Sequence, residues 1–305
     1  MNYKVHNQTI DLGNGREITL ETGKLAKQAD GSIVLRSGNT MLLATIVSSK
    51  DARDDVDFLP LTVDYREKYA AAGRFPGGFF KREARPSDTE VLVMRLVDRA
   101  LRPMFPSDYH AGTQVMVQLM SADAEVLPDS LVGLAASACI AVSDVPFNGP
   151  ISEVRVARID GKFIINPHRT ELESADIDMM VAGTIDSIVM VEGEMSEVSE
   201  NEMVEAIEAA AKAITAQCEA QIALAKAVGT HGVSREYCHE NHDDELKAKV
   251  FDTLYPTMYA AAQKEKTKSD RKVAFKAITS DFVATLSEDV TKEKAFILKS
   301  YLHDV

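Results

Sequence analysis

Residues 73–103 read GRFPGGFFKREARPSDTEVLVMRLVDRALRP, and this stretch contains the strongest local signals of the sequence. Ser87 precedes Glu90 by three residues, which is the capping-box pattern of a helix N-terminus. The pattern predicts a helix that ends near Leu101, because Pro103 removes a backbone donor and clashes with the preceding turn.

The same stretch is basic, although the whole chain is acidic. Its seven cations and four acids give a net charge of +3 (7 − 4), in a chain whose net charge is −13. The cations are Arg74, Lys81, Arg82, Arg85, Arg95, Arg99 and Arg102, and the last three would share one helix face at positions i, i+4 and i+7. An acidic chain is a poor general polyanion binder, so this concentration marks the expected place of any nucleic-acid contact.

Two aromatic residues, Phe79 and Phe80, directly precede two cations, Lys81 and Arg82, after the flexible turn at residues 76–78. Rings stack on bases and cations neutralise phosphates, so this order predicts contact with single-stranded nucleic acid without base selection. Another interpretation stays open. Adjacent phenylalanines are also typical of a core or a subunit interface, and the arginines of the helix can pair with acids of this or another subunit.

Length and composition bound the class of protein. The chain has 305 residues, enough for two ordinary domains, and its 45% hydrophobic and 27% charged residues are typical of a soluble globular protein. No run approaches the ~20 apolar residues of a membrane-spanning helix. The first residues contain no apolar signal segment, so we expect a cytoplasmic location and no membrane partner. Three cysteines (Cys139, Cys218, Cys238) suit a reducing compartment.

Residues 1–228 alternate strand and helix patterns, which predicts an α+β domain of mixed sheets packed with helices. Strands are expected at 32–36, 41–47, 114–120, 153–159, 162–165, 179–182 and 187–191. Turns at 37–40 and at Asp160-Gly161 are expected to join two hairpins. Helix patterns occur at 88–101, 131–142 and 197–227.

The composition changes after residue 228, and residues 229–305 are expected to form a linker and a small all-helical domain. Residues 229–242 have no periodicity, and helix-period segments follow at 248–261, 271–286 and 291–302. Pro256 is expected to break or kink the first of these helices. The linker contains His231, Cys238, His239 and His242 without the spacing of a zinc module, so we expect polar linker residues and no metal site.

Residues 73–106 resemble the signature region of the first RNase PH-type domain of bacterial polynucleotide phosphorylases. Segments 58–65, 145–150 and 181–184 are similar to family segments at corresponding positions, and the similarity extends from about residue 10 to 225. The resemblance implies an RNase PH-like domain, of the ribosomal protein S5 domain 2-like class, over residues 1–228. Residues 229–305 match the family's helical domain only in position and character. The family's chain continues with further domains, so this sequence resembles its N-terminal part.

The resemblance also implies a function. The family degrades RNA from its 3′ end, because inorganic phosphate attacks the terminal phosphodiester and releases a nucleoside diphosphate with the help of Mg²⁺. It implies single-stranded RNA as substrate, a homotrimer, and RNA-degradosome components as further partners. In the family the phosphorolytic site and its metal belong to the second RNase PH-type domain. This chain alone is therefore expected to be inactive.

The resemblance assigns roles to individual residues. In the family's trimer, loops of the Phe-Phe-Arg-Arg type line the entrance of a central RNA channel. Lys81 replaces the first arginine of that motif, which keeps the charge but loses the planar guanidinium. The implied RNA-binding residues are Arg74, Phe79, Phe80, Lys81, Arg82, Arg85, Arg95, Arg99 and Arg102.

The positions that match the family's phosphorolytic site carry unsuitable residues. The phosphate-binding turn falls on residues 126–130, where Pro128 lacks an N–H and Asp129, expected as an N-cap, is itself an anion. Asp178 matches a catalytic acid, but Met180 stands at the position of the family's lysine. Asp178 is thus the one candidate for a catalytic residue, and no metal ligand is expected.

Two other functions stay open. The chain could be a purely structural trimer scaffold, in which the loop around Phe79 packs between subunits without RNA affinity. It could also be a free-standing phosphorolytic exonuclease of the RNase PH kind, although Pro128, Asp129 and Met180 argue against this function.

Overall fold

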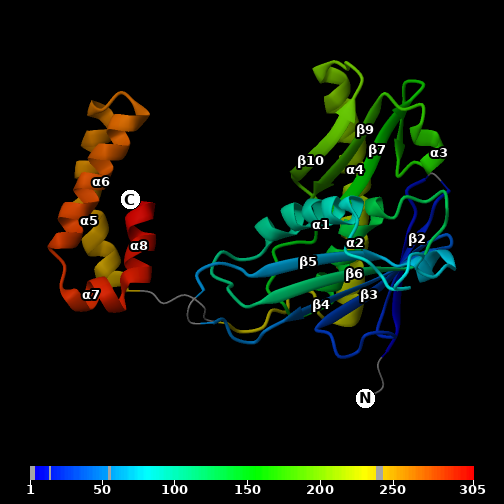
Figure 1. The fold of residues 1–305 in the computed structure, drawn as a ribbon, viewed down its shortest axis with the longest axis horizontal. Coiled ribbons are helices and arrows are strands. Elements are labelled where there is room, and N and C mark those ends of the chain that lie inside the picture. The colour runs from blue at the N-terminus through cyan, green and yellow to red at the C-terminus, as the bar shows by residue number, and fades with distance from the viewer. Residues whose placement is uncertain (1–3, 14, 54–55, 238–242) are drawn as a thin grey trace. The chain divides into compact units, whose positions relative to one another are not determined.

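A computed structural model describes residues 4–13, 15–53, 56–237 and 243–305. The chain divides into two compact units, Met1–Tyr237 and Cys238–Val305, and Figure 1 shows the elements of each. None of the described helices combines the length and apolar character that crossing a bilayer requires.

The first unit contains a six-stranded sheet of order β1-β2-β3-β4-β6-β5. In this sheet β5 and β6 pair in parallel, whereas the other neighbouring strands pair antiparallel. Two parallel strands need a crossover connection, and α1 (Asp88–Leu101) lies in the connection between β5 and β6. In the β3–β4 turn, Gly38 adopts a positive φ of 57° and Ser37 pairs with Thr40, which confirms the predicted hairpin. The strands are β1 (His6–Ile10), β2 (Ile18–Thr22), β3 (Gly31–Ser37), β4 (Thr40–Ser48), β5 (Leu61–Glu67) and β6 (Thr113–Ser121).

A second, four-stranded antiparallel sheet has the order β10-β9-β7-β8. Asp160 and Gly161 join β7 to β8 with φ values of 49° and 73°. Two positive φ angles are what a type I′ hairpin turn requires, so this predicted hairpin is also confirmed. The strands are β7 (Ser152–Ile159), β8 (Lys162–Ile165), β9 (Ile177–Gly183) and β10 (Ile188–Met195).

Helices α1 and α2 (Asp129–Ala141) lie between the two sheets (Figure 1). α2 packs on β3, β4 and β6 of the first sheet and on β7 of the second. Its side chains are buried at eleven of thirteen positions, which explains why its sequence is apolar on all sides. α4 (Glu200–Val228) covers β7 and β9 of the second sheet and contacts β1. The short elements η1 (Tyr69–Ala72), η2 (Arg102–Met104) and α3 (Arg169–Leu172) complete the unit.

The predicted capping box is present at the start of α1. The Ser87 hydroxyl accepts from the Glu90 N–H at 3.2 Å, and the Glu90 carboxylate accepts from the Ser87 N–H at 2.6 Å. Glu90 also accepts from the Glu67 N–H at 2.8 Å, which ties the helix to the end of β5. Burial opposes ionisation of Glu90, but these donors outweigh it and hold the pKa of this carboxyl below its usual range.

Replacing Ser87 by alanine is expected to lower the free energy of unfolding by about 1 kcal/mol, because the N–H of Glu90 loses its acceptor. Urea unfolding at pH 7 measures the change. Thr89→Ala, in the exposed first turn of the same helix, is the matched control and is expected to change little. Equal effects of the two substitutions would contradict a stabilising cap.

The second unit consists of helices with their own core. α5 (Asp244–Lys264) buries every fourth residue from Leu246 to Met258, and these side chains meet Phe282, Leu298 and Tyr301. Pro256 lies inside α5, so of the two outcomes expected from the sequence, a break or a kink, the break does not occur. Leu254 and Met258 are buried in one core on both sides of the proline, and this packing holds the helix together. The other helices are α6 (Lys268–Ala284), α7 (Glu288–Glu293) and α8 (Ala295–Asp304).

The segment 229–237, expected as part of a linker, packs on the first unit instead. The Arg235 guanidinium pairs with Asp30 at 3.2 Å and with Asp144. The Tyr237 hydroxyl donates to Asp108 at 2.9 Å. The boundary between the units therefore follows Tyr237, nine residues later than the expected end at Val228. Of the four expected linker residues with metal-binding side chains, Cys238, His239 and His242 lie outside the described residues.

Candidate nucleic-acid interface

The loop between η1 and α1, residues 73–87 and here called the Phe-Phe loop, presents three phenylalanine rings to solvent. Phe75, Phe79 and Phe80 are 75%, 92% and 80% exposed. The rings of Phe79 and Phe80 meet edge to face, with centroids 5.4 Å apart. Exposed rings gathered in one short loop form an apolar patch, which is typical of a contact surface. The alternative that these phenylalanines form the core of this unit is therefore wrong.

Cations lie directly beside these rings. Lys81 has a left-handed backbone (φ 51°) and its ammonium group lies 5.5 Å from the centroid of the Phe75 ring. Arg82 and Arg85 are exposed and form no ion pair within the described residues. The acid of the loop, Glu83, accepts from the Tyr69 N–H at 3.3 Å and so anchors the loop to η1. Rings and unpaired cations thus share one exposed segment.

The three arginines of α1 differ in what they contact. Arg95 is exposed and has no ion pair in the described part of the chain, whereas Arg99 pairs with Glu192 of β10 at 2.5 Å. Arg102 pairs with Asp98 at 2.6 Å and donates to the backbone carbonyl groups of residues 59 and 61. Intramolecular pairing therefore explains Arg99 and Arg102, and Arg95 alone keeps a charge available for a ligand.

A different arrangement occupies the N-terminus of α2. Pro128 is the N-cap, and Asp129 is the first helical residue, so the expected N-cap role of Asp129 is wrong by one position. The Arg155 guanidinium bridges Asp129 and Asp178, with N–O distances of 2.7 Å to Asp129 and of 2.7 and 2.8 Å to Asp178. Met180 is buried. Arg155 thus pairs with both carboxylates, and the three side chains together keep one negative charge.

These residues do not fit a divalent metal ion. Asp129 and Asp178 already share a guanidinium, which occupies the carboxylate oxygens that a cation would need. Among the residues that the structure describes, no group of three or more His, Cys, Asp or Glu side chains is placed to hold a metal.

Replacing Arg155 by methionine is expected to lower the free energy of unfolding by roughly 2 kcal/mol, because two partly buried carboxylates lose their counter-charge. The effect is smaller than for fully buried pairs because these groups are about one-fifth exposed. Urea unfolding measures it, and Arg155→Lys, which keeps one charge, should recover part of the loss. An unchanged stability would show that the bridge contributes nothing.

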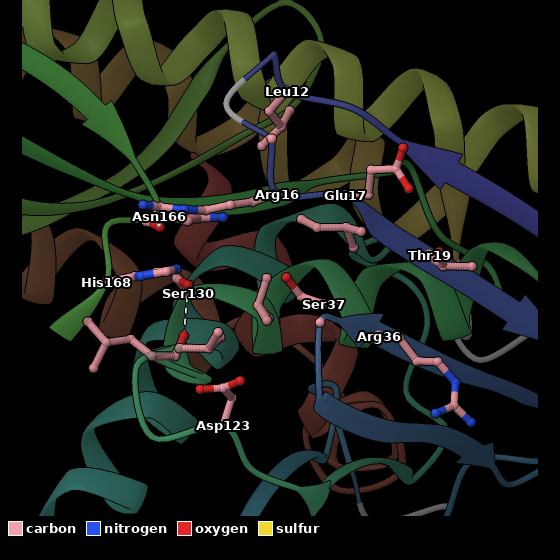
Figure 2. Close-up of a pocket in the computed structure, with 16 residues that line it drawn as sticks. Leu12, Arg16, Glu17, Thr19, Arg36, Ser37, Asp123, Ser130, Asn166 and His168 are labelled. Carbon is pink, nitrogen blue, oxygen red and sulfur yellow. Dashed lines mark hydrogen bonds between the residues drawn. The ribbon is translucent and has the colours of Figure 1, made fainter.

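A cavity of about 640 Å³ lies beside the first residues of α2, and residues of β2 and of the end of β3 also line it (Figure 2). The Ser130 hydroxyl donates to the Leu127 carbonyl group at 2.9 Å along its wall. Its charged lining residues are of both signs, namely Arg16, Arg36, Glu17 and Asp123, so the cavity offers no net attraction to phosphate. It contains neither Asp178 nor any residue of the Phe-Phe loop.

The fold defines the class of this protein. It is similar to the solved structure of Rrp46 from rice (Oryza sativa), with a TM-score of 0.53, 14% identity, and coverage of 67% of this chain and 92% of that one. At this identity the likeness shows the fold alone; together with the family models that match this chain, it confirms the predicted RNase PH-like α+β class.

Two family models match consecutive parts of the chain. The model described as "3′ exoribonuclease family, domain 1" matches residues 14–146, and the model for domain 2 of that family matches residues 149–213. The chain belongs to the 3′ exoribonuclease family. The models divide the first unit between α2 and β7, so strands β2 to β6 and the second sheet fall into different family domains.

Among its relatives are proteins named polyribonucleotide nucleotidyltransferase. Identity is 59% over 300 residues to that of Parabacteroides distasonis, covering 98% of this chain and 40% of that protein. It is 60% over 299 residues for Bacteroides fragilis (98% and 42%) and 56% over 301 residues for Porphyromonas gingivalis (99% and 40%). The chain spans about two-fifths of the length of these relatives and corresponds to their N-terminal part.

Proposed function

We propose that this chain is the RNA-guiding and ring-building part of a polynucleotide phosphorylase. The observation that carries the proposal is the exposure of Phe79 and Phe80, 92% and 80%, beside unpaired cations. The whole protein would degrade single-stranded RNA processively from its 3′ end, with inorganic phosphate as co-substrate and nucleoside diphosphates as products. It would act as a cytoplasmic homotrimer, with Mg²⁺ bound outside this chain and with RNA-degradosome components as partners.

The roles of the residues follow from their surroundings. The two exposed rings would stack on successive bases, which tolerates any base because each has an aromatic face. Lys81, Arg82 and Arg85 would neutralise the neighbouring phosphates, and Arg74 and Arg95 would extend the basic track. Arg99 would join this track only by exchanging Glu192 for a phosphate, and Arg102 would support the fold.

The N-terminus of α2 supports the proposal that RNA cleavage takes place outside this chain. A phosphate cradle needs free N–H groups, whereas here the Ser130 N–H donates to Asp129 at 2.7 Å. Asp178, the candidate catalytic acid, is held by Arg155. One guanidinium facing two carboxylates leaves a net negative charge, which disfavours the approach of phosphate.

The test is phosphate-dependent release of ADP from poly(A) in the presence of Mg²⁺ by this chain alone. We expect no ADP, while the full-length relative from P. distasonis, assayed in parallel, is expected to produce it. ADP release that is abolished by Asp178→Ala would instead make the chain a free-standing phosphorolytic exonuclease.

The same exposed rings favour one second candidate, a scaffold in which the Phe-Phe loop packs between subunits. Sedimentation velocity and RNA binding per subunit distinguish the two with Phe79→Ala. A lost oligomer with unchanged RNA affinity per subunit would favour the scaffold. Weaker RNA binding by a variant of unchanged oligomeric state would favour RNA guidance.

A further inference from the structure

The second unit contains its own concentration of positive charge. Residues 264–276, KEKTKSDRKVAFK, run from the last residue of α5 into α6 and contain six cations and two acids, a net charge of +4 (6 − 2). The remaining residues therefore carry −17 (−13 − 4). We call the six cations the α6 basic patch: Lys264, Lys266, Lys268, Arg271, Lys272 and Lys276.

The patch is not neutralised within the chain. All six side chains are exposed, and none forms an ion pair within the described residues, unlike Arg99 and Arg102 of α1. The acid in its middle, Asp270, is held by the helix cap, where its carboxylate accepts from the Thr267 hydroxyl at 2.6 Å. The described residues therefore supply no counter-charge to the patch, which stays available to an anionic partner.

The positions of these cations disfavour the helix that carries them. Lys268, Lys272 and Lys276 stand at i, i+4 and i+8, so neighbouring like charges share one helix face, which costs a few tenths of a kcal/mol per pair. Lys268 is also the first residue of α6, where the helix dipole favours acids over cations. Neither the helix dipole nor ion pairing within the described residues favours this arrangement, whereas an anionic partner would.

We propose that the α6 basic patch is a second contact for the phosphate backbone of single-stranded RNA, in addition to the Phe-Phe loop. The choice of RNA as the polyanion rests on the proposed function. The large apolar side chain exposed in this stretch is Val273, which offers no aromatic face. The contact is thus electrostatic, independent of base identity and strongly dependent on salt.

The experiment uses the full chain, a fluorescent 30-nucleotide oligo(A), and anisotropy titrations between 50 and 200 mM salt. The triple variant Lys268→Gln/Lys272→Gln/Lys276→Gln should reduce the slope of log K against log salt by about 2, which is 0.7 for each lost phosphate contact. Its loss of affinity should be about 20-fold larger at 50 mM than at 200 mM salt. Because the substitutions remove repulsion within α6, we expect no loss of helicity or stability.

The matched control, Lys24→Gln/Lys162→Gln/Lys226→Gln, makes the same charge change at exposed positions outside the patch, and its slope should stay unchanged. An equal change of slope in the control and patch variants would overturn the proposed site, because RNA affinity would then depend on the net charge and not on where the charges lie. An unchanged slope in the patch variant would also overturn it and would favour an acidic protein partner. Phe79→Ala/Phe80→Ala, titrated in parallel, tests the Phe-Phe loop separately, so the two proposals can fail independently.

Discussion

The double variant Phe79→Ala/Phe80→Ala is expected to bind single-stranded RNA roughly a hundredfold more weakly than the unaltered chain. Each ring is almost fully exposed, so it is free to stack on a base without rearrangement. Removing one base–aromatic stack costs about 1–3 kcal/mol, and about 1.4 kcal/mol corresponds to a factor of ten. Anisotropy titration of labelled oligo(A) at fixed salt measures the change.

Two comparisons make this result specific. Phe58→Ala removes another phenylalanine, 60% exposed, from outside the loop and should leave the affinity unchanged. The loss caused by the double variant should not alter the salt slope, since no charge is removed. Lys81→Ala/Arg82→Ala should instead reduce the slope by about 1.4. Unaltered affinity in the double variant would exclude stacking by these rings.

Local signals in the sequence predicted the elements that depend on neighbouring residues. The capping box at Ser87 and the hairpin turn at Asp160-Gly161 involve residues one to three positions apart, and both are present. The strands β1 and β2 were not predicted. β1 has the polar sequence HNQTI, of which only Ile10 is buried, and it exists because β2 pairs with it in a register that no local pattern encodes.

The candidate site likewise has features that the sequence shows and features that only folding creates. The order of two rings and two cations in the Phe-Phe loop can be read from the sequence, but the ion-pair partners of the other cations cannot. Arg99 meets Glu192, 93 residues away, and Arg155 lies between Asp129 and Asp178. Only folding brings these residues together, so the sequence predicts neither the pairing of Arg99 with Glu192 nor the position of Arg155. The charge of the α6 basic patch can be counted in the sequence, but its exposure and its lack of ion pairs within the described residues are known only from the structure.

One buried carboxyl group has no role in the proposed RNA contacts. Glu153 of β7 is 1% exposed, and neither of its carboxyl oxygens has a hydrogen-bond partner among the described residues. It faces Gly133 of α2, where an added Cβ would lie 2.4 Å from the Glu153 carboxyl, so only glycine fits there. Burial, reinforced by the charge of Asp129, raises the pKa of Glu153 to about 8.

This raised pKa makes the stability of the chain dependent on pH. The protonated form of Glu153 is favoured in the folded state, whereas the group ionises near 4.5 when unfolded. The contribution is therefore complete below about pH 4.5 and is lost as pH rises through about 8, with a total loss on the order of 5 kcal/mol. That is a large part of the 5–15 kcal/mol by which domains are usually stable.

Glu153→Gln is expected to remove this loss, because a buried amide cannot ionise. Urea unfolding of the unaltered chain should show a steep fall in the free energy of unfolding between about pH 4.5 and pH 8, and the variant should be flatter by several kcal/mol. Glu208→Gln, at an exposed position of α4, is the control and should keep the steep fall. The slope, rather than the absolute stability, is the decisive quantity, since the amide also lacks a partner and lowers stability equally at every pH. Parallel curves for the unaltered chain and Glu153→Gln would show that Glu153 is ionised in the folded protein and that a cation or water compensates its charge.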